Sequence, residues 1–144
     1  MKNLILITVV IALVYGYAQQ SEISLTGSPP VASDPEQVLQ FAYENRQSNL
    51  QVQGKGIVVK ILPDDRDGSR HQRFILKTGI GQTLLVAHNI DLAPRINEIE
   101  EGDVVEFFGE YEWNSKGGVI HWTHHDPARN HIDGWLKHTG RVYQ

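Results

Sequence analysis

The run Leu50-Gln51-Val52-Gln53-Gly54-Lys55-Gly56-Ile57-Val58-Val59-Lys60-Ile61 decides the fold class. Val52 and every second residue after it would lie on one face of an extended chain, and Gln53 and every second residue after it on the other. Such a two-residue repeat predicts a β-strand. Two glycines inside the run, Gly54 and Gly56, indicate strong coiling or the close approach of another backbone. We therefore predict a long first strand that bends at its glycines.

Four more segments are predicted to be strands, because they keep the two-residue repeat and are separated by turn-forming residues. In the first of these we expect Phe74 and Leu76 to face the core. Pro63–Gly68 is expected to be a loop, Asn89–Glu101 an irregular connection and Asn114–Gly118 a hairpin turn. The four strands are expected at His71–Thr78, Thr83–His88, Gly102–Trp113 and Val119 to about His124.

Five strands with an irregular connection between the third and fourth are typical of the oligonucleotide/oligosaccharide-binding (OB) barrel. The segment Ile99–Glu110 supports this interpretation, because a Gly-Asp turn precedes alternating apolar residues and Gly109 lets the strand bend. We predict a mainly β fold: a five-stranded OB-like barrel with one N-terminal helix and an irregular C-terminal tail. A small open sheet of another topology is the alternative.

The helix is expected just before these strands. Ser33 or Asp34 can cap it, and Pro35 suits its first turn, where a missing N–H costs nothing. Apolar residues within Val38–Tyr43 form one stripe, and the helix is expected to fade near Ser48-Asn49. Its expected role is to cover one end of the barrel.

Residues 1–18 are predicted to be a secretory signal peptide, since Lys2 precedes an apolar run and the small residues up to Ala18 suit a signal peptidase. An uncleaved anchor is the alternative, but Leu4–Tyr17 rises only about 21 Å as a helix against a hydrocarbon core of roughly 30 Å. We expect export to the periplasm or the extracellular space, with no stable membrane span after cleavage. Residues 19–33 are expected to be a flexible linker, and residues 34–144 a single OB-like domain that includes the helix.

Composition limits the chemistry available to this domain. The chain has 144 residues, no cysteine and a formal net charge of -4. The lack of cysteine excludes disulfides, a thiolate nucleophile and a zinc–thiolate site. Seven carboxylates and no Lys or Arg lie between Glu98 and Glu112, so bulk coating of nucleic acid is not expected.

The last third of the chain holds five of the seven histidines, between His121 and His138. On an extended strand, His121, Thr123 and His125 would share one face. Neutral imidazoles with one carboxylate suit Zn²⁺ or another divalent ion. Structural histidines that pack on Trp122 and Trp135, and metal-free acid–base chemistry, are the alternatives. The candidate metal ligands are His121, His124, His125, Asp126 and His131.

A second polar group is expected on the second and third strands. An arginine there can bind a phosphate while a histidine moves a proton, so His71, Arg73, His88 and Arg95 are candidate catalytic residues. The alternative is that the Asp-rich turn before His71 is only a turn and Arg73 pairs across the sheet. Tryptophans can stack on bases or sugars, although packing in the core is the commoner role, and we expect a core position for Trp122. The predicted ligand-binding residues are His71, Arg73, His88, Asn89, Trp113 and Trp122.

Several long polar stretches carry a resemblance to known sequences. They are His71-Gln72-Arg73-Phe74, Ala87-His88-Asn89-Ile90-Asp91-Leu92-Ala93-Pro94-Arg95, Gly109-Glu110-Tyr111-Glu112-Trp113-Asn114 and His121-Trp122-Thr123-His124-His125-Asp126-Pro127. With them, the region from Gly54 to Gln144 resembles a family of small exported bacterial proteins, a domain of unknown function. The resemblance implies a barrel-like exported domain and no assigned activity.

Two classes of function stay open at this point. The favoured class is a non-catalytic domain of the cell envelope that binds a small or oligomeric ligand through a face rich in His and Arg. The alternative is a hydrolase that uses Zn²⁺ or Mn²⁺ on phosphodiesters or nucleic acid, with Arg73 or Arg95 holding the anion. Binding is favoured because the sequence shows no recognisable set of nucleophile, base and orienting residue.

Overall fold

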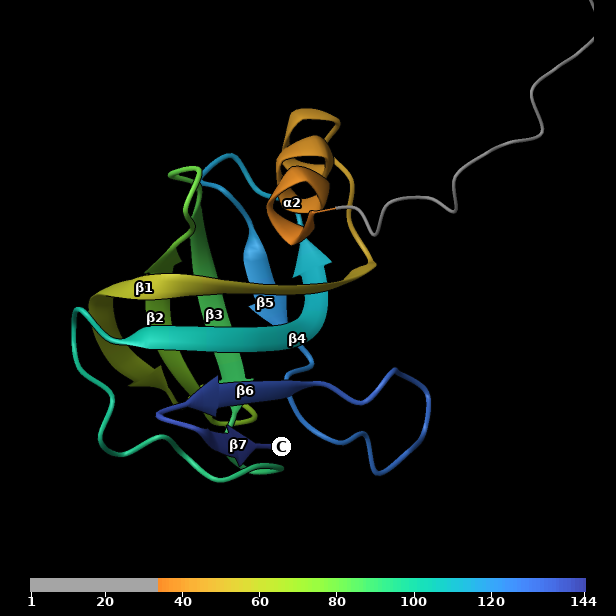
Figure 1. Cartoon of the computed structure of the whole chain (residues 1–144). Helices are drawn as coiled ribbons and strands as arrows, with labels where there is room; N and C mark the ends of the chain where they lie inside the picture. Colours follow the sequence, from red (N-terminus) through yellow and green to blue (C-terminus); the bar gives the residue numbers. More distant parts are fainter. Residues whose placement is uncertain (1–33) are drawn as a thin grey trace, which may run out of the picture. The chain divides into compact units, whose positions relative to one another are not determined.

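A computed structural model describes residues 34–144, so the predicted signal peptide (1–18) and linker (19–33) lie outside the described residues. The described part is mainly β, with one N-terminal helix and a mixed sheet (Figure 1). The elements in chain order are α2 (Pro35–Glu44), β1 (Leu50–Asp65), β2 (His71–Lys77), β3 (Thr83–Asn89), β4 (Val104–Glu112), β5 (Val119–His121), β6 (Trp135–His138) and β7 (Arg141–Tyr143).

Five of the seven strands close a ring of hydrogen bonds. The sheet order is β1-β2-β3-β5-β4-β6-β7, and β1 pairs with β4 as well as with β2. Strand β1 reaches both neighbours because Leu50–Ile57 pairs with β4 and Ile57–Asp65 pairs with β2. Strands β3 and β5 are parallel, and the other pairs are antiparallel. In Figure 1, β1 and β4 run across β2, β3 and β5.

The glycines of β1 allow this double pairing. A Cβ added at Gly54 would lie only 2.7 Å from Cζ of Phe107, and one added at Gly56 would lie 3.0 Å from Cβ of Leu76. Larger residues would therefore push β4 or β2 away from β1. A Cβ at Gly56 would also lie 3.0 Å from the carbonyl oxygen of Lys77, so the predicted close approach of another backbone is confirmed at Gly56.

The core lies inside the ring and follows the two-residue repeat. Phe74 and Leu76 face inward, as predicted, and alternate residues of β3 and β4 do the same. Helix α2 adds Leu39 and Ala42. The fully buried apolar side chains are Leu39, Ala42, Phe74, Leu76, Leu84, Val86, Ile96, Val105, Phe107, Tyr111, Ile120 and Leu136.

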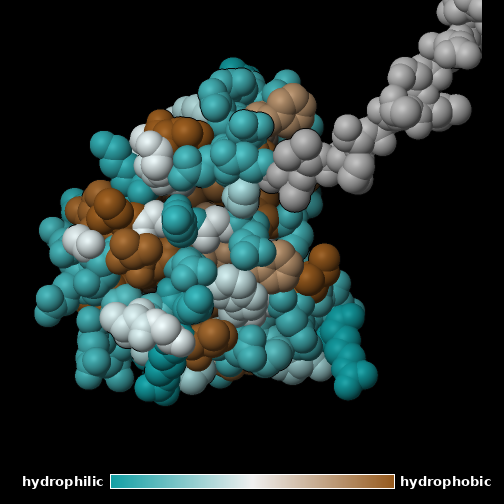
Figure 2. Space-filling view, in the orientation of Figure 1, coloured by the Kyte–Doolittle hydropathy of each residue, from teal (hydrophilic) through white to brown (hydrophobic). Residues whose placement is uncertain are grey.

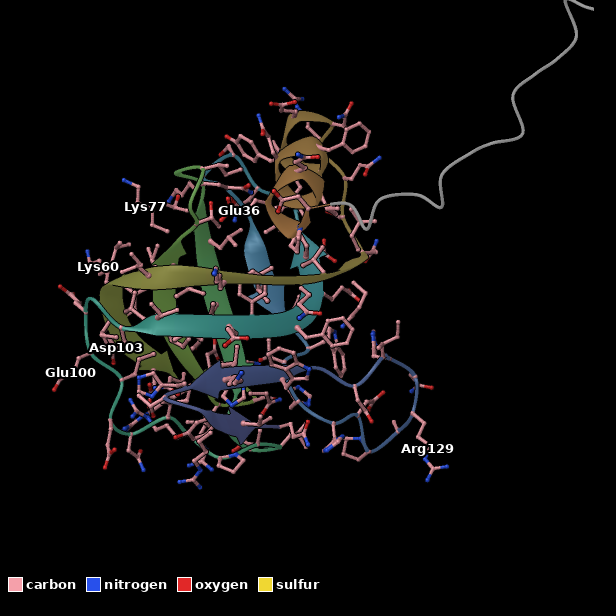
Figure 3. All side chains as sticks on the ribbon, in the orientation of Figure 1. Glu36, Lys60, Lys77, Glu100, Asp103 and Arg129 are labelled. Carbon is pink, nitrogen blue, oxygen red and sulfur yellow. The ribbon has the colours of Figure 1, made fainter. Side chains whose placement is uncertain are left out.

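Helix α2 packs at one end of the ring. Asp34 is its N-cap and accepts a hydrogen bond from the N–H of Glu36, which confirms one of the two predicted caps. The Glu36 carboxylate accepts the N–H of Gly79 (2.8 Å) and so joins the helix to the β2–β3 turn (Figure 3). The helix ends at Glu44, before the predicted Ser48-Asn49, and Asn45 caps it by donating to Phe41.

The C-terminal segment differs from the prediction. Strand β5 stops at His121 because Trp122 has a positive φ of 52°, which breaks the extended backbone. The tail is not irregular throughout, since β6 pairs with β4 and β7 pairs with β6. The buried ring of His138 holds β6 against the start of β4. Its Nε2 lies 2.8 Å from the carboxylate of Asp103, which Figure 3 labels beside β4.

The face shown in Figure 2 is mainly hydrophilic and carries several separate hydrophobic residues. Within residues 34–144, no helix has both the length and the apolar character needed to cross a membrane.

Candidate metal centre

Three side chains of types that can bind a metal ion converge on the outer face of β4 and β5. Glu110 and Glu112 are two positions apart on β4, so their side chains share a face, and the antiparallel register places His121 opposite Glu110. The three residues each offer a donor atom, and these atoms lie within 4.8 Å of one another. Among residues 34–144, no other three His, Cys, Asp or Glu side chains meet this condition.

The imidazole of His121 faces both carboxylates. Its Nε2 lies 3.5 Å from Oε1 of Glu110 and 3.9 Å from Oε1 of Glu112. This nitrogen is shielded from solvent and has no hydrogen-bond partner within residues 34–144. Burial lowers the pKa of His121 below its ordinary value, although the two carboxylates act in the opposite direction. An imidazole beside two carboxylates is a donor set for Zn²⁺ or Mn²⁺ when its nitrogen is deprotonated.

A second histidine approaches Glu110 from the loop between β5 and β6. Nδ1 of His131 lies 3.5 Å from Oε2 of Glu110, the oxygen that does not face His121. Its ring stacks on Trp122, with the ring centroids 3.7 Å apart and the planes 15° apart. The structure therefore brings His121 and His131, two of the predicted ligands, to one carboxylate.

The other three predicted ligands have different partners. Nδ1 of His124 is 2.7 Å from the carbonyl oxygen of His125, and Nδ1 of His125 is 3.1 Å from Asp133. The expected closure of His125, Asp126 and His131 around one point is not observed. Because β5 ends at His121, these residues lie on a loop rather than on one face of a strand.

Asp126 organises that loop instead of facing an ion. Its carboxylate accepts hydrogen bonds from the N–H groups of Ala128, Asn130 and His131, over 2.6–2.9 Å. Burial alone would raise the pKa of Asp126, but these hydrogen bonds hold it below its ordinary value. The loop tip, marked by Arg129 in Figure 3, projects away from the sheet.

The second predicted cluster is divided between the two faces of the sheet. His71 and Arg73 share the outer face of β2, as predicted, whereas His88 points into the core and is fully buried. Nδ1 of His88 is 2.8 Å from the Thr123 hydroxyl, and Nε2 is 3.2 Å from the Pro94 carbonyl. Burial lowers the pKa of His88 to about 4. His88 therefore does not share the outer face of the sheet with His71 and Arg73.

Both predicted anion-binding arginines have partners within the domain. Arg73 donates two hydrogen bonds to the Pro63 carbonyl, at 3.1 and 3.0 Å. Arg95 forms a two-point contact with the carboxylate of Asp64, at 3.1 and 3.2 Å. The two guanidinium groups thus hold the end of β1 and the segment after β3, and they do not form one phosphate cleft with His71.

The remaining predicted ligand-binding residues have structural contacts. The side chain of Asn89 accepts the N–H of Asp91 in a turn at the end of β3. The Trp113 indole donates to the carbonyl of Tyr43 (3.0 Å) and so ties the sheet to the helix. Trp122 is half-buried against His131, so its expected core position is wrong.

Glu110 and Glu112 were not predicted as site residues. The sequence does contain a signal for them, because the Asn114–Gly118 hairpin pairs Glu112 with Val119 and therefore Glu110 with His121. In the sequence these carboxylates stood out only as part of an acidic run that repels polyanions.

Comparisons with known proteins give a family and no activity. The family model described as "Protein of unknown function (DUF3465)" matches residues 20–144. A search of curated proteins finds no match. The family model covers the five-strand ring, the candidate metal centre and the C-terminal strands. The chain therefore belongs to the DUF3465 family of proteins of unknown function.

Proposed function

We propose that this protein is an exported, OB-like domain that binds a divalent transition-metal ion through Glu110, Glu112 and His121. One observation carries the proposal: a histidine nitrogen shielded from water, without a hydrogen-bond partner in the described chain, faces two carboxylates. A buried polar atom without a partner costs free energy, and coordination to a cation would remove that cost. Zn²⁺ is the expected ion, because imidazole and carboxylate are both common zinc ligands.

The ring topology supports the OB-like part of the proposal. The strands close in the order β1-β2-β3-β5-β4 and back to β1, with a coiled first strand shared by both neighbours. OB folds are five-stranded, partly open barrels. Export is supported by the sequence of residues 1–18, and the proposed location is the periplasm or the extracellular space.

The geometry favours metal binding over phosphodiester hydrolysis. Three protein ligands would leave a coordination position for water, which a hydrolase also requires. However, Arg73 and Arg95, the two arginines predicted to hold an anion, contact Pro63 and Asp64 instead of the three donors. Glu110 and Glu112 would also repel a phosphodiester unless the metal ion neutralised them. Hydrolysis therefore stays a prediction, and the proposal is limited to binding.

Calorimetric titration of the purified protein with Zn²⁺ tests the proposal. We expect one ion per chain, and a fall in affinity on the order of 100-fold or more in Glu110→Gln or His121→Gln, since each removes a direct ligand. Glu106→Gln is the matched control, because Glu106 is also on the outer face of β4 but contacts Lys137. Absence of Zn²⁺ binding, or equal effects in the Glu110 and Glu106 variants, would contradict the proposed site.

A further inference from the structure

We infer that His131 is a second imidazole ligand of this ion and that it selects Zn²⁺ over ions that prefer oxygen, such as Mn²⁺ and Mg²⁺. The inference rests on the proposed metal site and adds a ligand from a different segment of the chain. The three-donor group contains one nitrogen ligand and two carboxylates. His131 would make two nitrogen and two oxygen ligands.

The carboxylate of Glu110 connects the two histidines. One of its oxygens lies 3.5 Å from Nε2 of His121, and the other lies 3.5 Å from Nδ1 of His131. Both distances are longer than a typical hydrogen bond, so neither nitrogen forms a strong hydrogen bond with the carboxylate. His131 lies outside the three-donor group, so its ring would have to move from its contact with Glu110 for all four donors to meet one ion.

Several contacts hold the His131 ring in this position. Trp122 stacks on one face of the ring at 3.7 Å, and Asp126 accepts the N–H of His131 at 2.9 Å. Asp133 accepts the N–H of Asp126 at 2.8 Å, which anchors the loop on its other side.

The backbone of Trp122 adds to this support. Its φ of 52° lies in the left-handed region, which bulky L-residues seldom adopt. Strained residues of this kind persist where the surrounding structure holds them, and they concentrate at ligand clamps and switch regions. Here the strained residue ends β5 one position after His121 and places its indole beneath His131. Trp122 thus lies between the two proposed imidazole ligands, next to His121 in sequence and stacked on His131.

The number of nitrogen ligands determines which ion such a site prefers. Mg²⁺ and Mn²⁺ favour oxygen ligands in octahedral geometry, whereas Zn²⁺ accepts nitrogen and oxygen in tetrahedral geometry. A site of two carboxylates and one imidazole is compatible with either group of ions. Addition of His131 shifts the preference toward Zn²⁺.

Competition titrations with a chelating dye test this role in the wild type, His131→Ala and His125→Ala. His125 is the matched control, because it lies on the same loop but its ring faces Asp133. We expect His131→Ala to weaken Zn²⁺ binding by about 10- to 100-fold and Mn²⁺ binding by no more than about threefold. The ratio of Zn²⁺ to Mn²⁺ affinity would then fall at least about tenfold, while His125→Ala would keep the wild-type ratio.

An unchanged affinity ratio in a folded His131→Ala variant would overturn the inference and leave the three-ligand proposal intact. Absence of Zn²⁺ binding by the wild type would instead overturn the proposed function. Should His131→Ala not fold, zinc X-ray absorption of the wild type gives the answer without a variant. Two imidazoles per zinc are expected, and one imidazole would overturn the inference.

Discussion

His88 and His121 lie on neighbouring strands, face opposite sides of the sheet and are both partly or wholly removed from water. Burial lowers the pKa of each. The difference is in their partners: both nitrogens of His88 are matched, by the Thr123 hydroxyl and the Pro94 carbonyl, whereas Nε2 of His121 has no hydrogen-bond partner within residues 34–144. Whether the ring nitrogens have hydrogen-bond partners, more than how deeply the ring is buried, distinguishes a structural histidine from a candidate metal ligand.

The geometry also fixes the tautomer of His88. The Pro94 carbonyl can only accept, so Nε2 must carry the hydrogen, and Nδ1 then accepts from the Thr123 hydroxyl. This arrangement ties the end of β3 to the loop that follows β5. A hydroxyl bonded to a neutral imidazole resembles an activated nucleophile, but Thr123 is fully buried, so the contact is structural.

The largest expected difference between the two histidines is in stability. His88→Ala should reduce the free energy of unfolding by about 3–5 kcal/mol, because it creates a cavity and leaves Thr123 and Pro94 without a partner. His121→Ala should cost about 1 kcal/mol or less in the absence of metal, since it breaks no hydrogen bond. Urea denaturation of both variants measures this, and similar losses would remove the distinction.

The next effect is the dependence of stability on pH. The unfolded chain protonates His88 below about pH 6.5, but folded His88 stays neutral down to about pH 4. The unfolded state therefore binds more protons in this window, and the free energy of unfolding falls as the pH falls from 6.5 to 4. The full loss is about 3 kcal/mol.

Denaturation across that window, in the wild type and in His88→Gln, measures this contribution. The variant should have the shallower slope, because glutamine can still bond Thr123 and Pro94 but does not titrate. Parallel profiles for the two proteins would mean that His88 is protonated as easily in the folded state as in the unfolded one.

Stabilisation by Zn²⁺ should also distinguish His121 from His88. Zn²⁺ at about 100 times its Kd should raise the free energy of unfolding by about 2.7 kcal/mol, because it binds the folded state. His88→Gln should keep this increment, and His121→Gln should lose it. Chemical denaturation with Zn²⁺ and with a chelator gives both values. Equal increments in the two variants would show that Zn²⁺ stabilises the protein from another position.

The smallest expected effect concerns Trp122. As a core residue it would contribute about 3–5 kcal/mol, but its half-buried stack on His131 predicts a loss of only about 1–2 kcal/mol in Trp122→Ala. Trp122→Gly should be more stable than Trp122→Ala by about 1 kcal/mol, since glycine adopts a positive φ without strain. The opposite order in thermal unfolding would contradict the left-handed backbone at this position.

The sequence predicted the parts of the fold that long repeats encode. The alternation from Leu50 onward, the glycines that face Phe107 and Leu76, and the inward Phe74 all follow from a period of two. Strands β6 and β7 have only four and three residues, too few for a repeat to stand out. They form because β5 pairs with β4 only at Glu110–Glu112, which leaves Val105–Phe108 on the same edge of β4 to pair with β6.

The candidate site was predicted only in part, because it depends on strand register and on single backbone angles. His121 and His131 were recognised from residue type, but the positive φ of Trp122 removed His125 and Asp126 from the expected face. Glu110 could be recognised as a site residue only from its pairing with His121 across β4 and β5. Likewise, His88 could be assigned to the core only when the inner face of β3 was known.

Anomalous diffraction at the zinc edge, from crystals of the zinc-loaded protein, tests whether Glu110, Glu112 and His121 bind the ion. We expect one strong peak per chain, bonded to Nε2 of His121 and to carboxylate oxygens of Glu110 and Glu112, at about 2.0–2.2 Å. A peak at His124, His125 and Asp126 instead, or no ordered zinc on the outer face of β4 and β5, would contradict it.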